Sequence, residues 1–570
     1  MSLDSGSYWS RFERTVLRAD RSRRQLLKGG LVAGVGAVGA ATVGCGSSSS
    51  KSTPTPSASN SGTATGGATA SANAGAGTPK AGGDLTLAYS LSPSSLDPQL
   101  GNSGGDGYYW KAMFDTLVGL NSQYLPTANL SLATSWENPD PTTFIFHLRD
   151  GVTLHDGTKF DSSLVQWNIQ RVQNPQLRST AAASFASVQS VDTPDPLTAT
   201  FKLKQPNSAL LGLLGDRGGA IISRTAAEKY GDQFGSHPVG SGPFVFQEWV
   251  PNSDVKMTKN PNYWRKDASG NALPYLNSVT VKIIPDPTSS LASLQAGQLQ
   301  LSAVAAKDVS GVQGNSSLNL AKMEGASIAS LFCFNTDKPA VKDARVRQAI
   351  SCAVNPDAVN KSVYFGLNSV AQAGMWPINT WVYQPIPDRP KYDVQKAKQL
   401  LSAAGVNGNL SVEMVTWTDD PSQVQQATLY QAQLKQVGID AKISQFNVGT
   451  ATANFFVNGM GDFYSTGWSR YPEPAWDAQN NYAATGYYNP MKKWIDPKLQ
   501  DLLNQGLATA DEQQRKSVYA KVDEIVVAQQ AFYVPFLYGT SFAASTKKLQ
   551  GTDTLFAGDG KWLYAQLWFS

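Results

Sequence analysis

Imidazole and thiol groups, which carry much of the chemistry of enzymes and metal sites, are scarce in this chain. The 570 residues include three histidines and three cysteines. A zinc site needs ligands clustered at short spacings. No such spacing links the six side chains, which are Cys45, Cys333, Cys352, His147, His155 and His237. The sequence also lacks a P-loop and a Gly-x-Gly-x-x-Gly motif that follows a strand. We therefore expect no bound metal and no cofactor.

His155, Asp156 and Asp150 lie close enough in the sequence to suggest an acid–base cluster. They belong to a Gly-rich turn after a strand-like segment, where such side chains usually fix the turn by local hydrogen bonds. No other pair of carboxylates has a spacing that points to hydrolysis. We predict that the protein is not an enzyme. The alternative among enzymes is a secreted hydrolase that uses carboxylates. Release of a cleaved product would reveal such an activity.

The formal net charge of +4 comes from the first part of the chain. Residues 1–44 hold seven of the 47 basic side chains and three of the 43 acidic ones, which leaves 40 of each for residues 45–570. That remainder is neutral and has no basic run that could follow a line of phosphates. Nucleic-acid binding is therefore disfavoured.

Residues 1–44 have the order of an export signal. Arg23 and Arg24 are followed by leucines and Lys28, and then by a weakly apolar stretch over residues 29–44. Sixteen residues rich in glycine and alanine are too short and too mildly apolar for a stable membrane span. The paired arginines resemble a twin-arginine signal, which exports proteins that have already folded.

Cys45 ends the segment Thr42-Val43-Gly44-Cys45, which resembles a bacterial lipobox with threonine in place of the usual leucine. We expect lipidation of Cys45; the alternative is an ordinary cysteine near a cleaved signal. Residues 45–83 are then a disordered tether, because a stretch of Ser, Thr, Ala, Gly and Pro cannot bury enough apolar area to fold. The predicted location is the outer face of the cytoplasmic membrane or the periplasm, with a lipid anchor.

The body, residues 84–570, alternates strand-like and helix-like segments. Strand patterns cover 85–89, 143–148, 411–417 and 439–443. Asp393 can cap a helix over 394–404 that ends before Gly405, and a second helix over 424–437 stops at Gly438. Strand, helix and strand in that order indicate an α/β fold.

Two further helices are well marked near the C-terminus. Asp496-Pro497 is a capping residue and a first-turn proline before a helix that reaches Leu507. The stripe of Val518, Val522, Ile525 and Val526 indicates another helix. Stretches rich in Gly, Pro and Tyr at 231–276 and 465–495 are expected to be coil. Cys333 and Cys352 are predicted to be either two buried thiols or a disulfide.

Four motifs give the body a resemblance to a known family. They are FHLRDGVTLHDGT at residues 146–158, PVGSGP at 238–243 with NPNYW at 260–264, FNT at 334–336 with DARVRQAI at 343–350, and YVPF at 533–536. In this order they resemble the extracellular solute-binding proteins of bacterial ABC importers, in the class of oligopeptide-, dipeptide- and nickel-binding proteins (family 5).

The resemblance implies an α/β, two-lobed periplasmic-binding-protein fold with a hinge and an extra subdomain in the first lobe. The first lobe would take residues 84–325 and return at 535–570, and the second lobe would take 326–534. Such a protein encloses its ligand between the lobes and closes by hinge rotation. We expect a monomer that delivers its solute to an ABC permease.

The resemblance also suggests ligand contacts in the segment 465–474. Trp468 is expected to line the cleft, with a core tryptophan as the alternative. Peptide-binding members carry an aspartate where this chain has Arg470, which suggests an anionic ligand because guanidinium binds carboxylates in a two-point fork. The alternatives are a surface arginine, or one paired to Asp462 or Glu473. Glu473 could itself replace the aspartate.

Other aromatic residues stand at strand ends or in loops, where open α/β sheets place ligands. These candidate ligand contacts, each of which could instead be packing, are Tyr89, Tyr109, Trp110, Trp376 and Trp417. Peptides or peptide-like solutes are the expected ligands. Oligosaccharides, opines and metal chelates remain alternatives, and so does a sensor lipoprotein that kept the fold without a transporter.

Overall fold

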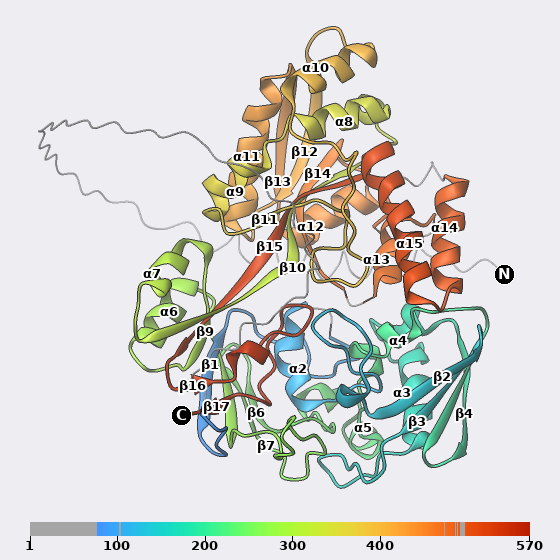
Figure 1. Ribbon diagram of the computed structural model, residues 1–570, viewed down its shortest axis with the longest axis vertical. Coiled ribbons are helices and arrows are strands. Elements are labelled where there is room, and N and C mark those ends of the chain that lie inside the picture. The colour runs from blue at the N-terminus through green and yellow to red at the C-terminus, as the bar shows by residue number, and fades with distance from the viewer. Residues whose placement is uncertain (1–76, 102–103, 472, 485, 487, 491–495) are drawn as a thin grey trace, which may run out of the picture. The chain divides into compact units, whose positions relative to one another are not determined.

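The computed structural model describes residues 77–101, 104–471, 473–484, 486, 488–490 and 496–570 (Figure 1). The predicted export signal and Cys45 lie outside these residues. Gly82 and Gly83, predicted as the end of the tether, are hydrogen-bonded to Tyr275 and Asn277 of the body. No helix within the described part of the chain has the length and apolarity required to cross a bilayer.

Eleven strands of the described residues form one mixed sheet. Ten of them follow the order β13 (Ile439–Phe446), β12 (Leu410–Trp417), β14 (Phe463–Ser469), β10 (Leu318–Phe334), β15 (Tyr533–Thr546), β9 (Leu301–Ala303), β1 (Asp84–Tyr89), β8 (Ser278–Ile283), β7 (Asp254–Lys259) and β6 (Phe244–Val250). The short β11 (Ser369–Val370) pairs with β15. The first-lobe strands therefore lie at one end of this order and the second-lobe strands at the other.

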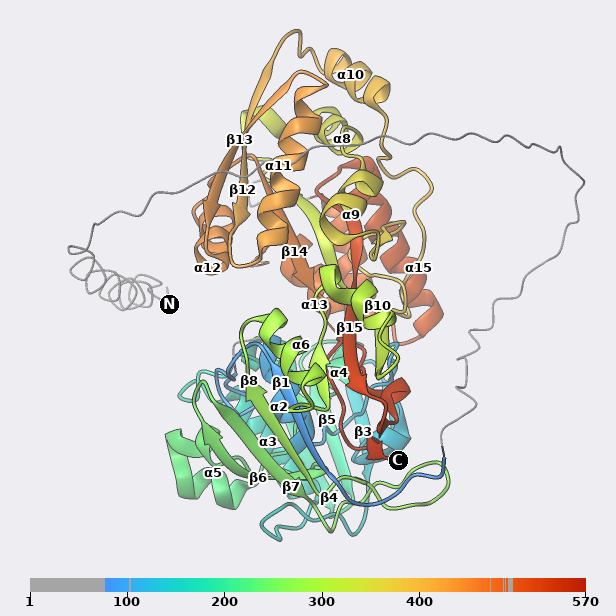
Figure 2. The same ribbon diagram turned by 90° about the vertical axis from the view of Figure 1, so that its left-hand side faces the viewer.

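The long antiparallel strands β10 and β15 connect the two lobes (Figure 2). Their register shifts between Met323 and Ser327, where Gly325 has a φ of 65°. The predicted lobe boundary after residue 325 coincides with this irregularity. Residues 535–538, predicted to return to the first lobe, still pair with β10 and β11. Two paired strands are the only sheet contacts described between the lobes, and an irregular point in such a pair is suited to hinge motion.

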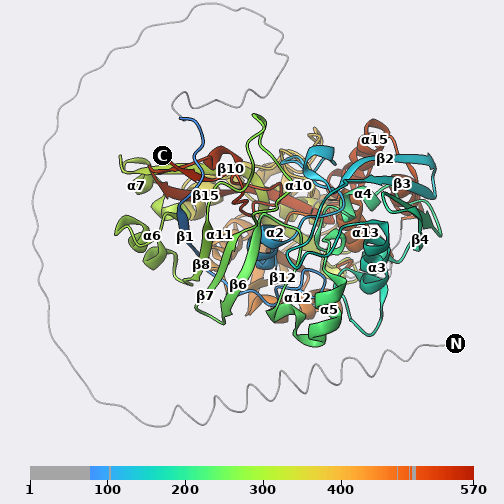
Figure 3. The ribbon, with the colours of Figure 1, turned by 90° about the horizontal axis from the view of Figure 1, so that it is seen from below.

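A separate four-stranded antiparallel sheet forms the extra subdomain of the first lobe, as the resemblance predicted. Its order is β2 (Ala133–Asp140), β3 (Thr143–Leu148), β5 (Thr198–Leu203) and β4 (Val188–Asp195). Helix α3 (Ser162–Gln173) lies against it (Figure 3). Alternating buried residues of β3, among them Phe146, pack on Ile169 of α3 and form the core of this subdomain.

Most of the predicted helices begin and end near the positions that their capping residues indicated. Asp393 and Asp496 accept hydrogen bonds from the first turns of α10 and α14. The first lobe also contains α2 (Gly107–Met113), α4 (Leu210–Leu213), α5 (Arg224–Tyr230), α6 (Pro287–Gln295) and α7 (Val309–Gln313). The second lobe contains α8 (Ala344–Cys352), α9 (Pro356–Tyr364), α10 (Val394–Ala403), α11 (Pro421–Lys435), α12 (Val448–Thr452), α13 (Pro474–Tyr482), α14 (Pro497–Ala508) and α15 (Glu512–Asp523).

The two stretches predicted as coil are structured, so that prediction was wrong. Residues 231–276 contain the hairpin β6–β7, and 465–495 contain most of β14 and all of α13. The Gly, Pro and Tyr residues that suggested coil flank these elements. Cys333 in β10 and Cys352 at the end of α8 are both buried free thiols, and burial raises the pKa of each.

Local hydrogen bonds hold the turn around His155, as expected: Asp150 accepts from the Gly151 amide at 2.8 Å and Asp156 accepts from the Thr158 amide at 3.0 Å. Two long-range contacts add to these. The His155 ring lies 2.9 Å from the Gly242 carbonyl, and Asp156 accepts a hydrogen bond of 2.5 Å from Ser223. The contact between His155 and Gly242 joins the 146–158 and 238–243 motifs. The two stretches that carry the family resemblance therefore support the fold of the first lobe.

Candidate functional site

A cavity of about 330 Å³ lies between the two lobes. Its first-lobe lining is Gly101, Thr180, Ala181, Ser184, Phe185, Leu213, Asp216, Arg217, Gly218, Asp559 and Lys561. Its second-lobe lining is Ser469, Arg470, Tyr471, Glu473, Trp476 and Tyr488. A concave site with both charged and aromatic walls between two lobes is the usual form of a small-ligand site.

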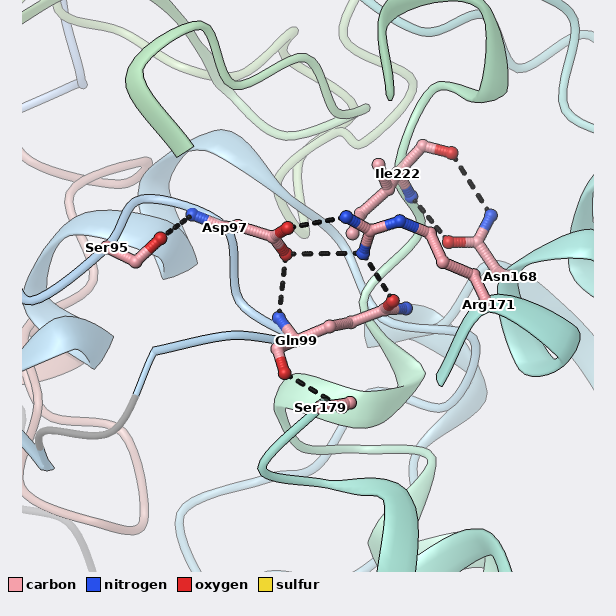
Figure 4. Close-up of polar contacts among 7 residues, drawn as sticks. All are labelled: Ser95, Asp97, Gln99, Asn168, Arg171, Ser179 and Ile222. Atoms are coloured by element: carbon pink, nitrogen blue, oxygen red, sulfur yellow. Dashed lines mark hydrogen bonds and ion pairs between the residues drawn. The ribbon is translucent and has the colours of Figure 1, made fainter. Parts of the chain in front are cut away.

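A buried ion pair fixes the first-lobe wall (Figure 4). Arg171 of α3 contacts the Asp97 carboxylate at 2.6 Å and donates to Gln99 Oε1, also at 2.6 Å. The Asp97 carboxylate in turn accepts a hydrogen bond from the Gln99 amide. Asn168, one turn before Arg171, exchanges two hydrogen bonds with the backbone of Ile222. Helix α3 therefore anchors the loop that contains Asp97 and Gln99 through charge-assisted bonds.

The same network reaches the cavity itself. The Gln99 carbonyl accepts a hydrogen bond from Ser179 Oγ at 2.8 Å (Figure 4). The same carbonyl accepts a hydrogen bond from the Thr180 amide at 3.2 Å. Thr180 Oγ1 donates to the Gly101 carbonyl at 3.0 Å, and the Arg217 guanidinium donates to that same carbonyl. Gly101, Thr180 and Arg217 all line the cavity. Their positions therefore depend on the Asp97–Arg171 pair.

Aromatic rings form the second-lobe wall. Tyr471 and Trp476 stack with their ring centroids 3.8 Å apart, and Tyr488 stands edge-on to Trp468 at 4.9 Å. Trp468 donates from Nε1 to the carboxylate of Asp477 in α13 at 3.3 Å. Burial raises the pKa of Asp477 well above its usual value. Trp468 lies behind Tyr488, which itself lines the cavity.

Arg470 lines the cavity but is 7% exposed. Its two Nη atoms donate to the carbonyls of Gly325 and Asn379, at 3.1 and 2.6 Å. The guanidinium also lies over the ring of Tyr124, and its burial lowers the pKa of Arg470. Backbone carbonyls therefore occupy the two-point fork that was expected to face a ligand. Neither alternative partner is used, since Glu473 pairs elsewhere and Asp462 accepts from the Glu413 amide.

Glu473 is 3% exposed and forms an ion pair with Arg515 of α15. The same carboxylate caps α13 by accepting a hydrogen bond from the Ala475 amide at 3.0 Å. A side chain at Gly212 of the first lobe would begin 2.7 Å from Glu473 Oε2. The two lobes therefore approach closely here, and a side chain at position 212 would require Glu473 to shift.

The other five predicted contacts lie outside the lining of this cavity. Tyr89 stacks on Tyr108, and Tyr109 is fully buried. Trp376 is 2% exposed and packs on α15, and Trp417 at the end of β12 donates to Thr466. Trp110 lines a different cavity of about 370 Å³ within the first lobe. Most of these rings pack within the protein core, which was the alternative to ligand contact in the sequence analysis.

Four charged residues of the wall were missed: Asp216, Arg217, Asp559 and Lys561. Asp216 has no hydrogen bond or ion pair to another described side chain. Asp559 lies 3.6 Å from Lys111; burial acts to raise its pKa, but Lys111 and Lys561 outweigh this and lower it. Their sequence signal was weak, because charged residues beside glycines usually indicate a solvated turn.

Comparison with known proteins agrees with this architecture. The model of the family "Bacterial extracellular solute-binding proteins, family 5 Middle" matches residues 127–489, which is more than half of the chain. The chain belongs to this family. It is therefore a solute-binding protein of the ABC-importer type, and it is not an enzyme.

Individual relatives cover most of this solute-binding protein. The glutathione-binding proteins GsiB of Shigella dysenteriae and of Escherichia coli K12 are each 28% identical over 489 residues, which is 83% of this chain and 92% of theirs. The structure of Helicobacter pylori DppA with the peptide STSA has a TM-score of 0.70 and 25% identity, over 86% of this chain and 98% of that one. AgaA of A. tumefaciens R10 with agropinic acid shares the fold, with a TM-score of 0.70 and 24% identity over 86% and 99%.

Proposed function

We propose that this protein captures a short peptide-type solute with charges of both signs between its lobes and delivers it to an ABC permease. The interlobe cavity supports this proposal, because its lining includes carboxylates, guanidinium groups and an ammonium group beside stacked aromatic rings. Ionic groups of a solute lose water when the lobes enclose them and need partners of opposite charge there.

The balance of charge around the cavity favours an acidic solute. Glu473 is paired with Arg515, and Asp559 lies near Lys111. The lining then has Asp216 as its remaining carboxylate, against the cations of Arg470 and Lys561. A solute with one ammonium group and more than one carboxylate complements this set. Glutathione has that charge pattern, and the GsiB relatives are named for binding it.

Closure of the lobes provides the signal for delivery. Both lobes supply lining residues, so a solute enclosed between them contacts more protein in the closed arrangement than in an open one. A ligand shifts such an equilibrium only by its stronger binding to one state. A permease that recognises the closed form would therefore respond to loaded protein.

The solute class is tested by calorimetry on the purified chain. The panel contains glutathione, free and N-acetylated tripeptides, an oligosaccharide, an opine and a nickel–histidine chelate. The proposal predicts binding of glutathione or a free tripeptide, with affinity at least tenfold lower for the acetylated tripeptide. Binding of the sugar, opine or chelate with all peptides silent would contradict it and would favour one of those alternative ligands.

The proposed delivery includes export and a lipid anchor at Cys45, which the sequence motifs support. A C45A variant should lose incorporation of labelled fatty acid and move from the membrane fraction to the soluble exported fraction. Uptake of the bound solute should fall when the gene for this protein is deleted. Uptake that survives the deletion would contradict a role in delivery and would favour the sensor alternative.

A further inference from the structure

A second cavity adjoins the one already described. It has a volume of about 430 Å³, and Thr180, Ser184, Leu213 and Trp476 line both. From there it extends away from Arg470 and Lys561, which line only the first cavity. Both lobes contribute to its walls, because Gln205 and Asn207 belong to the first lobe and α13 to the second. The interlobe site therefore has two compartments.

The two compartments differ in charge. All charged residues in the described lining of the pair belong to the first cavity, and two of them are Asp216 and Lys561. The described lining of the second cavity has amides, small hydroxyls and apolar groups, including Gln205, Gln479 and Leu507. A charged group placed there would lose water without a counter-charge, whereas a peptide amide would find hydrogen-bonding partners.

A direct contact between the lobes lies beside the second cavity. Ser208 of the first lobe donates from its amide to the Leu507 carbonyl at 2.7 Å and from Oγ to the Gly506 carbonyl at 2.9 Å. Gly506 and Leu507 belong to the last turn of α14. The neighbouring residues Asn207 and Leu507 both line the second cavity. This compartment is therefore complete only when the lobes are together.

From this arrangement we infer that the protein takes peptide-type solutes with a charged head and an uncharged tail. The head lies in the first cavity among Asp216, Arg217 and Lys561, and the tail extends past Trp476 into the second cavity. This inference rests on the proposed function and narrows its substrate class. Some solutes are too long for the first cavity alone. The protein binds these when the side chains far from the charged head are neutral.

The test compares three peptides that share a free amino-terminal glutamate and end as amides. One has two alanines after the glutamate, one has four, and the third is the longer peptide with its last alanine replaced by lysine. On the wild-type chain, the longer neutral peptide should bind at least tenfold more tightly than the shorter one. The lysine-tailed peptide should lose most of that gain.

Substitutions at Gln205, an exposed residue that lines only the second cavity, locate the tail. Q205E should improve binding of the lysine-tailed peptide by about two- to fivefold, as expected for a solvent-screened ion pair, and Q205K should weaken it. Neither variant should change binding of the shorter peptide. Q313K, on the exposed part of α7 outside both cavities, is the matched control and should change nothing.

The outcomes separate this inference from the proposed function. Equal affinity for the short and long neutral peptides, or a lysine tail that binds as well as a neutral one, would overturn the second compartment and leave peptide binding intact. An unchanged response to Q205E and Q205K would overturn the placement of the tail. Failure of every peptide to bind would overturn both proposals.

Discussion

The guanidinium carbon of Arg470 lies 4.6 Å from the centroid of the Tyr124 ring. Arg470 follows β14 of the second lobe, whereas Tyr124 belongs to the first. The same guanidinium donates to the carbonyl of Gly325, at the irregular point of β10. Arg470 thus links the second lobe to the first lobe and to the strand that connects them. This cation–π contact joins the two lobes, in addition to the positive charge that Arg470 brings to the cavity.

Ser208→Ala should weaken solute binding by about two- to tenfold, because one hydrogen bond that joins the lobes contributes about 0.5–1.5 kcal/mol. The unliganded variant should unfold at nearly the wild-type temperature. Calorimetry and thermal melting measure the two effects. Ser293→Ala is the matched control, since Ser293 makes a similar bond to a carbonyl inside α6. Unchanged affinity in S208A would show that this contact does not favour closure.

Glu473→Gln should destabilise the fold by about 3 kcal/mol, because it leaves the buried Arg515 without its counter-ion. Solute affinity at a temperature where the variant is folded should change little. Denaturant unfolding measures the loss, and adding Arg515→Met should restore much of it. If E473Q instead keeps its stability and loses solute binding, Glu473 contacts the solute directly.

Trp468→Ala should weaken solute binding more than tenfold while the fold is retained. The substitution removes the ring that supports Tyr488 and leaves the buried Asp477 carboxyl without its donor. Trp468→Phe keeps a ring against Tyr488 and should lose less affinity. Calorimetry on both variants, with circular dichroism as a check of the fold, makes the comparison. Wild-type affinity in W468A would mean that the second-lobe wall lies elsewhere.

Asp523 should make stability depend on pH. Its carboxyl accepts a hydrogen bond from the Gly374 amide, and the nearby groups are Arg389, Tyr482 and Tyr538. Burial raises its pKa from 3.8 to about 8, against the opposing effects of Gly374 and Arg389. Between these values the folded state binds a proton that the unfolded state has released. The free energy of unfolding therefore falls as pH rises, by up to about 1.4 kcal/mol per pH unit.

Asp523→Asn should remove this contribution, because the amide does not titrate and can still accept the Gly374 hydrogen bond. Denaturant unfolding at pH 5 and pH 8 should show a smaller loss of stability in the variant than in the wild type. Asp501→Asn, on the exposed side of α14, is the control and should leave the wild-type difference unchanged. Equal pH dependence in D523N and the wild type would contradict the raised pKa.

Local signals in the sequence predicted much of the fold. Alternation identified β3 to the residue, and Asp393 and Asp496 marked the starts of α10 and α14. Motif order indicated two lobes, and the family match confirms this architecture. Strand alternation and helix capping depend on residues close together in the chain, so they can be recognised in a single sequence. The coil prediction failed at β6–β7 because turn residues at its flanks outweighed the strand pattern between them.

The cavity wall was harder to predict because it depends on distant parts of the chain. Asp216 and Lys561 line one cavity although they belong to segments far apart in the sequence. Trp376 looked like a loop aromatic, but α15 supplies Tyr519 to pack against it. The sequence identified Arg470 as a cleft residue. It did not show that the guanidinium bonds to the carbonyls of Gly325 and Asn379, which belong to distant segments. Only the folded structure shows which polar groups already have hydrogen-bonding partners within the protein.

Calorimetric titration of free and N-acetylated tripeptides into the wild-type chain and into D216N tests solute binding in the interlobe cavity most directly. Asp216 has the carboxylate that is available to a solute ammonium group, so D216N should bind the free tripeptide at least tenfold more weakly than the wild type does. The weak binding of the acetylated tripeptide should be the same in both proteins. Equal affinity of D216N and the wild type for the free tripeptide would contradict binding of the amino group in this cavity.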